Sequence, residues 1–464
     1  MHQRLVVVGG GAAGMSAASA ARRLDPDLDI VVLEAGGYAA YGMCGLPYYL
    51  SGVVAGAEAL LAYPPSFFRE QRRVDLRLHT PVTRLDPDHR VVHFRENGRD
   101  ARLEYHRLIV TTGASPVVPP LRGLDDPYVF TVRTMEDAIS LRSLIDAGHI
   151  GRALIVGGGY IGLEMAEAMA ARGVKVTLAE ALPALMPNLD PPISELVEEE
   201  VRRHGVDLRL GTSLEQVRRT PDGLKAILGS KSVPVDVVVV AVGVRAGATI
   251  AAEAGAATGP GGALLVDDQM RTSLPDVYAA GDCIAPFHRV LGRPAFVPLG
   301  PAANKTGRVA GTVAAGGQAR FTGIVGTAVV KVFDLAVART GLTLGEAIAE
   351  GLPAVATDTV GKSRAKYYPG SDPVHVRLVH ETGGRLLGAQ MVGGDGVAKR
   401  IDVVAVALQA GFDVDELAGA DLSYAPPYAP VYEPILLAAQ AAQAKPAPDR
   451  PAEAPSHAAA GSRR

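Results

Sequence analysis

Two stretches of the chain repeat one arrangement of apolar, glycine and acidic positions. Each copy starts with a continuous apolar run, at Leu5 in the first and at Ala153 in the second, and continues into a turn of the form G-x-G-x-x-G. An alanine-rich segment follows each turn, and a second apolar run then ends in an acid, Glu34 or Glu180. This order predicts a strand, a helix and a second strand, which is the βαβ unit of a doubly wound α/β domain.

The residue types in each copy suit the binding of a dinucleotide. Glycines permit the tight turn and close approach of the backbone, and the following helix points free N–H groups and a positive dipole at a pyrophosphate. The acid accepts hydrogen bonds from ribose hydroxyls. One such turn would be weak evidence for a nucleotide site, since glycine-rich turns occur in other α/β folds. Two copies, each with its strand, helix and acid, indicate two nucleotide sites. The candidate contacts are Gly9, Gly11, Ala13, Gly14 and Glu34 in the first copy and Gly157, Gly159, Ile161, Gly162 and Glu180 in the second.

The rest of the chain changes character along its length. Further apolar runs at 108–111, 235–242 and 272–280 predict buried strands that end in short turns. From about residue 322, strand-like alternations mix with amphipathic helices, which indicates an α+β domain without a nucleotide motif. From residue 440 to Arg464 the chain is rich in alanine and proline, and we expect a disordered tail. The predicted strands of the α+β domain are 328–333, 374–380 and 386–392, and its clearest predicted helix is 396–409.

Composition narrows the class of protein. The 464 residues suffice for about three domains, and 48% hydrophobic and 20% charged residues fit an ordinary soluble protein. The net charge of −3 comes from well-mixed charges, so we expect no nucleic-acid partner. The longest apolar run, 235–242, is far shorter than the ~20 residues of a membrane helix. Because no signal-peptide layout or metal pattern stands out either, we expect a cytoplasmic protein without membrane or metal.

Cys44 is the most informative single residue. It lies just downstream of the first glycine turn, and the only other cysteine is Cys283, so a disulfide framework is excluded and a reducing cytosol is favoured. A lone thiol beside a nucleotide site has no local disulfide partner. If Cys44 is redox active, it must bond to a small thiol, a sulfane sulfur or an oxygen. The alternative is a buried, silent cysteine, which is the role we expect for Cys283.

The chain resembles the flavin-dependent pyridine nucleotide–disulfide oxidoreductases over nearly its whole length. The ordered marks are the two glycine turns, Thr112-Gly113-Ala114 between them, and Ala279-Ala280-Gly281-Asp282 after them. The resemblance implies that the first turn and Glu34 bind FAD, that Asp282 holds the ribitol end, and that the second turn binds NAD(P)H. The additional cofactor contacts that it implies are Thr112, Gly113, Ala114, Gly243, Gly281 and Asp282.

This resemblance implies a glutathione reductase-like α/β fold with two Rossmann-like nucleotide-binding domains and a C-terminal α+β dimerisation domain. We expect a discontinuous FAD-binding domain at 1–115 and 245–321, with the NAD(P)H-binding domain inserted at 116–244. The dimerisation domain is expected at 322–439 and the tail at 440–464.

The single cysteine points to one branch of the family. That branch holds coenzyme A-disulfide reductases, persulfide and sulfur reductases, NADH oxidases and NADH peroxidases, and 302–308, 366–370 and 422–430 are similar to it. The resemblance implies that electrons pass from NAD(P)H through FAD to Cys44 and then to a low-molecular-weight disulfide, persulfide or polysulfide. An activity like that of the coenzyme A-disulfide reductases is favoured. Arg22 and Arg23 either meet phosphates of coenzyme A or are simply solvated.

The chain also departs from its branch. Ala12 stands where NADH oxidases and peroxidases usually carry a histidine, which counts against those activities. Ala40 and Met43 stand where coenzyme A-disulfide reductases often have serine and asparagine, which leaves the disulfide substrate open. Two alternatives remain. One is an NADH oxidase that reduces oxygen through a Cys44 sulfenic acid, and the other is an electron-transfer flavoprotein in which Cys44 is silent.

The redox chemistry needs a reactive thiolate and an acid for the leaving thiol. We expect Cys44 to start a helix over 45–51 whose dipole lowers the thiol pKa. By resemblance, Tyr424 and Tyr368, with Tyr428 and Tyr367 as alternates, lie near the cysteine of a partner subunit and donate a proton to the departing sulfur. This implies a homodimer with shared active sites. The alternative is a set of ordinary tyrosines in a dimer interface.

Three residues bear on the nicotinamide. By resemblance Tyr160 covers the flavin until the nicotinamide displaces it, and Glu164 either contacts the nicotinamide or faces solvent. Glu180 at the ribose position disfavours a 2′-phosphate, so NADH is favoured over NADPH.

Overall fold

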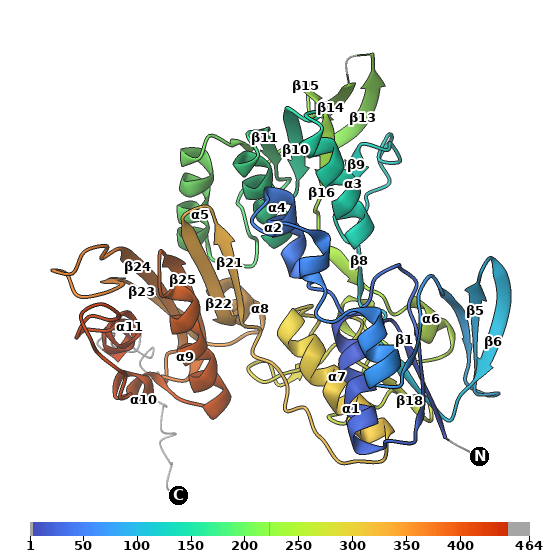
Figure 1. Ribbon diagram of the computed structural model, residues 1–464. Helices are drawn as coiled ribbons and strands as arrows, with labels where there is room; N and C mark the ends of the chain where they lie inside the picture. Colours follow the sequence, from blue (N-terminus) through green and yellow to red (C-terminus); the bar gives the residue numbers. More distant parts are fainter. Residues whose placement is uncertain (1–2, 222, 444–464) are drawn as a thin grey trace, which may run out of the picture. The chain divides into compact units, whose positions relative to one another are not determined.

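The computed structural model describes residues 3–221 and 223–443 (Figure 1). The chain divides into two compact units, one ending at Arg339 and the next beginning at Thr340. The first unit is built on two parallel sheets and the second on an antiparallel one. This confirms the predicted α/β fold with two Rossmann-like regions followed by an α+β region.

The first parallel sheet has the strand order β18-β7-β1-β2-β3 (Figure 1). The central strand β1 is apolar and buried between parallel neighbours on both sides. Helix α1 packs against α7 through glycines, because an added Cβ at Gly307 or Gly311 would overlap the backbone carbonyls of Ala13 or Ala17. The elements are β1 (Arg4–Val8), α1 (Ala12–Leu24), β2 (Asp29–Leu33), β3 (Asp75–Arg77), β7 (Arg107–Val110), β18 (Val277–Ala279) and α7 (Gly300–Ala314).

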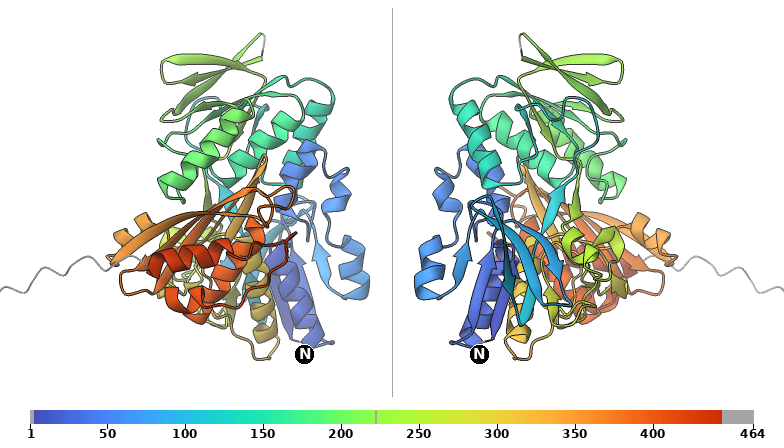
Figure 2. Two further views of the ribbon diagram at one scale, coloured as in Figure 1. Left: turned by 90° about the vertical axis from the view of Figure 1, so that its left-hand side faces the viewer. Right: turned by 90° about the vertical axis from the view of Figure 1, so that its right-hand side faces the viewer.

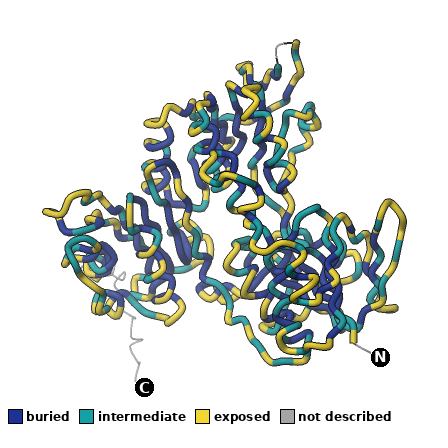
Figure 3. Tube along the Cα trace, in the orientation of Figure 1, coloured by how far each residue is buried: buried dark blue, intermediate teal, exposed yellow. Residues whose placement is uncertain are grey.

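The second parallel sheet has the order β12-β11-β10-β16-β9 and repeats the plan of the first. Strand β10 pairs with β11 in parallel, as β1 pairs with β2, and the helix between them follows the second glycine turn. Its strands form the dark, buried interior of this region in Figure 3. The elements are β9 (Val129–Phe130), α3 (Met135–Asp146), β10 (Arg152–Val156), α4 (Tyr160–Ala171), β11 (Lys175–Ala179), α5 (Pro191–Arg203), β12 (Asp207–Arg209) and β16 (Val237–Val240).

Two antiparallel three-stranded sheets accompany the parallel ones, and the sequence pattern did not single them out. The first is β4 (Val82–Asp86), β5 (Val91–Glu96) and β6 (Arg99–Glu104). The second, at the top of both views in Figure 2, is β13 (Leu214–Thr220), β14 (Gly223–Leu228) and β15 (Lys231–Val235). Between the nucleotide regions, β8 (Ala114–Pro116) pairs antiparallel with β17 (Val244–Ala246). The chain therefore leaves and re-enters the first region along adjacent strands.

Shorter elements complete the first unit. They are the helical turns η1 (Met43–Gly45), η2 (Ala57–Leu60), η3 (Phe67–Gln71) and η4 (Pro260–Gly262), the helices α2 (Leu46–Ser51) and α6 (Thr249–Glu253), and the strands β19 (Phe287–His288) and β20 (Arg293–Pro294). The hairpin β21 (Ala328–Val332) and β22 (Leu335–Gly341) follows, and the chain passes into the second unit within β22.

The second unit holds the antiparallel strands β23 (Ala354–Lys362), β24 (Pro373–Glu381) and β25 (Leu386–Gly393). Its helices are α8 (Leu344–Ala349), α9 (Val397–Ala410), α10 (Val414–Ala418) and α11 (Pro434–Gln443). Helix α11 corrects the predicted start of the tail at residue 440, since Ala439 and Ala442 are buried on it. The remaining residues of that tail lie outside the described part of the chain. Over residues 3–221 and 223–443, no helix has the length and apolar character to cross a bilayer.

Candidate active site and nucleotide-binding turns

The first glycine turn is shaped for a close ligand. Gly9 has a φ of +103°, and an added Cβ there would overlap the carbonyl oxygen of Thr111. Gly14 leaves room for the Gly9 carbonyl in the same way. At Gly11, by contrast, an added Cβ would meet no atom within 4 Å, and this residue is the N-cap of the 13-residue helix α1, which no side chain caps. The open N-terminus fits the diphosphate of a dinucleotide.

Glu34 sits at the edge of this turn, at the end of β2. Its carboxylate accepts hydrogen bonds from the N–H groups of Gly10 at 2.6 Å and Gly36 at 2.7 Å. The bonds fix the acid next to the turn, where the ribose of a dinucleotide would reach it.

The second glycine turn repeats these contacts. Gly157 has a φ of +104°, and Glu180 accepts hydrogen bonds from Gly158 at 2.7 Å and Leu182 at 2.8 Å. Gly159 is the uncapped start of the 12-residue helix α4, with open space where a Cβ would lie. The two turns therefore offer the same cradle for a diphosphate.

The residues around Thr112 and Asp282 lie close to the first glycine turn and to the start of α1. The Thr112 hydroxyl donates to the carbonyl of Gly247, and the Gly247 N–H donates to the carbonyl of Gly113 at 2.8 Å. Gly281 has a φ of +83°, and an added Cβ there would lie 2.8 Å from the Cβ of Ala13 on α1. Asp282 follows directly, and burial raises the pKa of its carboxyl. The Gly-Asp turn thus lies at the open end of α1, while Ala114 begins β8.

Cys44 is a free, exposed thiol in the turn η1. The helix α2 begins two residues later, at Leu46, and has only six residues. The pKa of Cys44 is raised, first by desolvation and then by the negative charges of Glu164 and Asp282. This corrects the predicted lowering, because the partial desolvation of this surface thiol and two carboxylates outweigh one short helix. It also means that Cys44 lies within electrostatic reach of residues from both nucleotide regions.

Arg133, which no sequence motif marks, acts against this rise in the Cys44 pKa. Its Nη1 donates to the sulfur of Met43 at 2.7 Å, its Nε donates to the carbonyl of Ala114 at 2.9 Å, and its charge lowers the pKa of Cys44. Arg133 lies between β9 and α3 in a segment without a motif, so no local signal marks it.

Tyr48 was also missed. It donates a hydrogen bond to Glu164, which links α2 to α4. Burial and the neighbouring Glu167 raise the pKa of Glu164 to about 7. Glu167 itself pairs with Lys331 and accepts a hydrogen bond from the N–H of Phe333 at 2.8 Å.

Other predicted residues line the second turn. The hydroxyl of Tyr160, the first residue of α4, accepts a hydrogen bond from Asn188 at 2.9 Å. Ile161 is 41% exposed, which is unusual for isoleucine and leaves an apolar surface open beside the turn. Gly243 has a φ of +111° after β16.

The candidate acids belong to the second unit. The hydroxyl of Tyr424 lies 3.4 Å from that of Tyr367, within hydrogen-bond distance, and both side chains are exposed. The same two segments are joined by the Ala365 N–H, which donates to the Pro426 carbonyl at 3.1 Å. Tyr368 is 37% exposed on the same segment as Tyr367. The phenol beside Tyr424 is therefore that of Tyr367.

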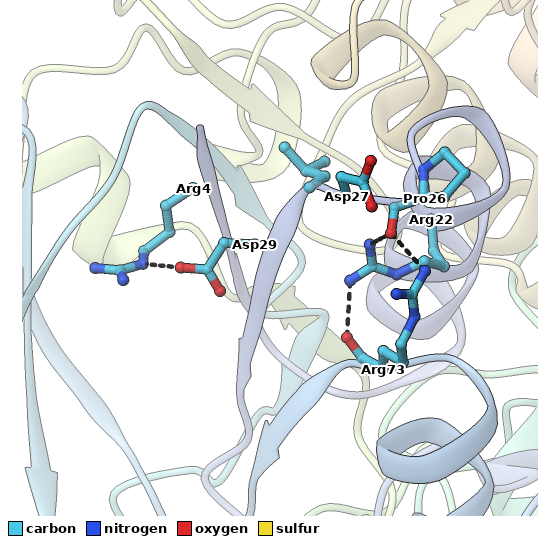
Figure 4. A pocket seen from close by; sticks show the side chains of 7 residues that line it. Arg4, Arg22, Pro26, Asp27, Asp29 and Arg73 are labelled. Atoms are coloured by element: carbon cyan, nitrogen blue, oxygen red, sulfur yellow. Dashed lines mark hydrogen bonds and ion pairs between the residues drawn. The ribbon is translucent and has the colours of Figure 1, made fainter. Parts of the chain in front are cut away.

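Arg22 has a structural role. Its guanidinium donates to four backbone carbonyls, among them those of Pro26 and Arg73, both at 2.7 Å (Figure 4). Arg22 and Arg73 line a cavity of about 510 Å³ whose rim also holds the Arg4–Asp29 ion pair. Burial, followed by the charge of Arg73, lowers the pKa of Arg22. Most of its donors are thus used within the protein.

Two further groups can be assigned to packing and ion pairing. Cys283 is fully buried, and burial raises its pKa to about 11. Among the described residues, Glu200, His204 and Asp334 bring together atoms that could hold a metal. Arg203 already pairs with Glu200 at 2.5 Å and with Asp334 at 3.0 Å, so the carboxylates have a counter-ion.

Comparison with known proteins identifies the family. The pyridine nucleotide-disulphide oxidoreductase family matches residues 3–319, and the dimerisation domain of the same family matches residues 327–434. The chain belongs to the pyridine nucleotide-disulphide oxidoreductases. This family uses FAD and NAD(P)H, and its dimerisation domain indicates a homodimer. The residue types at both glycine turns fit those two nucleotides.

Several members of the family are similar over nearly the whole chain. The NAD(P)H coenzyme A polysulfide/persulfide reductase of Pyrococcus horikoshii is 37% identical, with 95% of this chain and 98% of the relative covered. An NADH oxidase of Methanocaldococcus jannaschii is 34% identical, covering 95% and 99%. The structure of an NAD-dependent persulfide reductase from A. fulgidus is 38% identical with a TM-score of 0.92, covering 95% of this chain and 83% of that one. These relatives confirm the predicted enzyme class and its cysteine branch.

Proposed function

We propose that this flavoprotein uses NAD(P)H to reduce a low-molecular-weight disulfide, persulfide or polysulfide, with Cys44 as the redox-active sulfur. The favoured substrates are those of the coenzyme A-disulfide reductase type. The observation that carries the proposal is the setting of Cys44. It is a free, exposed thiol on which Glu164 of the second nucleotide region and Asp282 of the first both act. A thiol within reach of both nucleotide regions is placed to accept electrons from a flavin bound there and to pass them on to a small substrate.

The chemistry balances around one sulfur. In the resting protein Cys44 holds a small thiol in a mixed disulfide, and two electrons cleave that S–S bond, releasing the thiol with a proton and leaving the Cys44 thiolate. Bound FAD supplies the two-electron link from NAD(P)H to this sulfur. The thiolate then attacks a substrate RSSR, a new Cys44–SR bond forms, and RS⁻ leaves and takes a proton. The sum is NAD(P)H + H⁺ + RSSR → NAD(P)⁺ + 2 RSH.

We assign the proton for the leaving thiolate to Tyr424, acting from the partner subunit of a homodimer. Its hydroxyl lies 3.4 Å from that of Tyr367, so Tyr367 is placed to donate to the phenolate that forms when Tyr424 gives up its proton. Tyr368, the neighbour of Tyr367, remains a candidate contact to the substrate.

The cofactor contacts follow the two turns. The first turn would hold FAD, with Glu34 binding the ribose and Thr112, Gly113, Ala114, Gly281 and Asp282 contributing the remaining contacts. The second turn would hold NADH, since the Glu180 carboxylate would repel a 2′-phosphate. Tyr160, Ile161, Glu164 and Gly243 would contribute the remaining contacts to NADH. On this basis we propose the FAD-binding domain at 1–115 and 245–321, the NADH-binding domain at 116–244 and the dimerisation domain from residue 322.

A second candidate is an NADH oxidase, which the name of the Methanocaldococcus jannaschii relative favours. In this reaction Cys44 cycles through a sulfenic acid and oxygen is the acceptor. Ala12 weighs against it, because a methyl group offers no proton donor or acceptor at that position.

The deciding experiment is an anaerobic titration of the purified protein with NADH, with mass spectrometry of the released products. Two equivalents per FAD and a released small thiol or sulfide would support the proposal and name the substrate class. Two equivalents without a released thiol would favour the oxidase. One equivalent would mean that Cys44 was already reduced or is redox-silent, and an electron-transfer flavoprotein would become the function to test. Cys44→Ser should lose disulfide turnover, whereas the matched control Cys283→Ala should keep it.

A further inference from the structure

Arg400 is a buried charge that the reaction outlined above does not use. It lies on α9 in the second unit and is 7% exposed. Its Nε pairs with the carboxylate of Glu433, which is 6% exposed. The other oxygen of Glu433 accepts a hydrogen bond from the N–H of Ile435 at 2.6 Å, at the start of α11. A buried ion pair contributes little to net stability compared with apolar packing, so stability alone does not explain why Arg400 and Glu433 are buried here.

The guanidinium reaches two separate backbone segments. Its Nη2 donates to the carbonyl of Ser363 at 2.9 Å and lies 3.4 Å from that of Tyr428. Ser363 opens the segment 363–372 that follows β23, and Tyr428 belongs to the segment 419–433 that precedes α11. Gly396 leaves room for the guanidinium, because an added Cβ there would overlap Nη1. One side chain thus ties both segments to the same point.

These segments carry the two phenols whose hydroxyls meet. Tyr367 lies four residues after Ser363, and Tyr424 lies four residues before Tyr428. Within the single chain the side chains are 75% and 49% exposed, so packing inside the subunit does little to hold them. Their separation of 3.4 Å therefore depends on the backbone beneath, which is held by Arg400 and by the Ala365–Pro426 hydrogen bond.

We propose that Arg400, paired with Glu433, is a positioning residue that sets the distance between the hydroxyls of Tyr367 and Tyr424. Its part in the reaction rests on the proposed function, in which Tyr424 is the acid. The planar guanidinium offers several donors in fixed directions, so it can bond Glu433 and two carbonyls at once. A lysine ammonium in its place keeps the charge but not this geometry.

The test combines a structural and a kinetic measurement on the holoenzyme. The protein is labelled with 3-fluorotyrosine, and the ¹⁹F signals of Tyr367 and Tyr424 are assigned by their Phe variants. Arg400→Lys should shift both signals and change their titration, and it should lower turnover of a disulfide such as coenzyme A disulfide about tenfold. Arg385→Lys is the matched control, because its guanidinium pairs with Glu381 at 3.0 Å and is half exposed.

A double-mutant cycle shows whether Arg400 acts through Tyr424. Tyr424→Phe should slow turnover about a hundredfold, as expected for loss of a general acid. In that background Arg400→Lys should cost less than twofold more, because residues that act as one unit are not additive. Multiplying losses, or unchanged ¹⁹F signals in Arg400→Lys, would overturn the inference while leaving the proposed function standing.

A failure of the proposed acid role of Tyr424 can be told apart from a failure of the positioning role of Arg400. If Tyr424→Phe turns over normally while Arg400→Lys still shifts both ¹⁹F signals, the acid role of Tyr424 fails and the positioning of the two phenols stands. If Arg400→Lys does not fold, the double variant Arg400→Met with Glu433→Met removes the charges together, which buried pairs tolerate far better than loss of one partner. It must show the same shifted signals and the same loss of turnover, or the inference falls.

Discussion

Tyr48 donates a hydrogen bond to Glu164, and this bond joins the helix after Cys44 to the helix after the second glycine turn. Glu164 is mostly buried, and its pKa is raised from 4.5 to about 7 by burial and by Glu167. Its negative charge in turn raises the pKa of Cys44. A carboxyl with a pKa of about 7 therefore lies within electrostatic reach of the Cys44 thiol.

The first prediction concerns stability. The folded protein holds a proton on Glu164 up to about pH 7, whereas the unfolded chain releases it near pH 4.5. The free energy of unfolding should therefore fall as pH rises between these values, by at most about 3 kcal/mol.

Glu164→Gln cannot ionise, so its free energy of unfolding should not show this fall. Its melting temperature should match the natural protein at pH 4.5 and exceed it at pH 8, while Glu195→Gln on the exposed face of α5 should show no such trend. An equal difference at both pH values would contradict the assignment.

The second prediction concerns the thiol itself. Glu164→Gln should lower the pKa of Cys44, because it removes a nearby negative charge that raises it. The measurement is the rate of Cys44 alkylation by iodoacetamide in reduced protein, followed by mass spectrometry across the pH range. Buried Cys283 serves as the internal reference, which should stay unmodified. Unchanged inflection points in the variant would show that Glu164 does not control the thiol.

The parts of the fold and of the candidate site that could be predicted from the sequence are those that depend on local patterns. The glycine turns, their helices and the acids Glu34 and Glu180 lie within about thirty residues of one another, so spacing alone predicts each βαβ unit. The direction of the Cys44 pKa was wrong, because the helix dipole is a local argument. The charges that decide it come from Glu164 and Asp282, far away in sequence.

Residues without a local pattern were missed for the same reason. Arg133 is 90 positions from Met43, and Arg400 is 33 positions from Glu433. Only the folded chain brings such pairs together. The choice of Tyr367 over Tyr368 as the neighbour of Tyr424 likewise depends on which way the segment turns, and neighbouring tyrosines look alike in sequence.

The third prediction tests Arg133. Its charge lowers the pKa of Cys44, so Arg133→Met should raise that pKa and reduce the thiolate present at neutral pH. Turnover at pH 7 should fall in proportion to the lost thiolate, and this loss should recover as the pH rises. Arg133→Lys keeps the charge and should retain most of the activity, and Arg245→Met, an exposed arginine on β17, is the control. A loss that is equal at every pH would mean that Arg133 acts on binding or folding alone.

The fourth prediction uses the equivalence of the two glycine turns. Gly11 and Gly159 have φ values of −73° and −84°, which alanine adopts easily, and neither has an atom within 4 Å of an added Cβ. Gly11→Ala and Gly159→Ala should therefore fold normally, yet each new methyl group would fill the cradle where a diphosphate must lie. We expect Gly11→Ala to weaken FAD binding at least about tenfold, or about 1.4 kcal/mol, with NADH binding retained. Gly159→Ala should weaken NADH binding by a similar factor and retain FAD binding.

Both affinities are measured by calorimetry, on the FAD-free protein for FAD and on the FAD-loaded protein for NADH. Gly14→Ala, where the Cβ would overlap the Gly9 carbonyl, should instead disrupt folding of the whole region. If Gly11→Ala and Gly159→Ala weaken the same nucleotide, the assignment of one nucleotide to each turn is wrong.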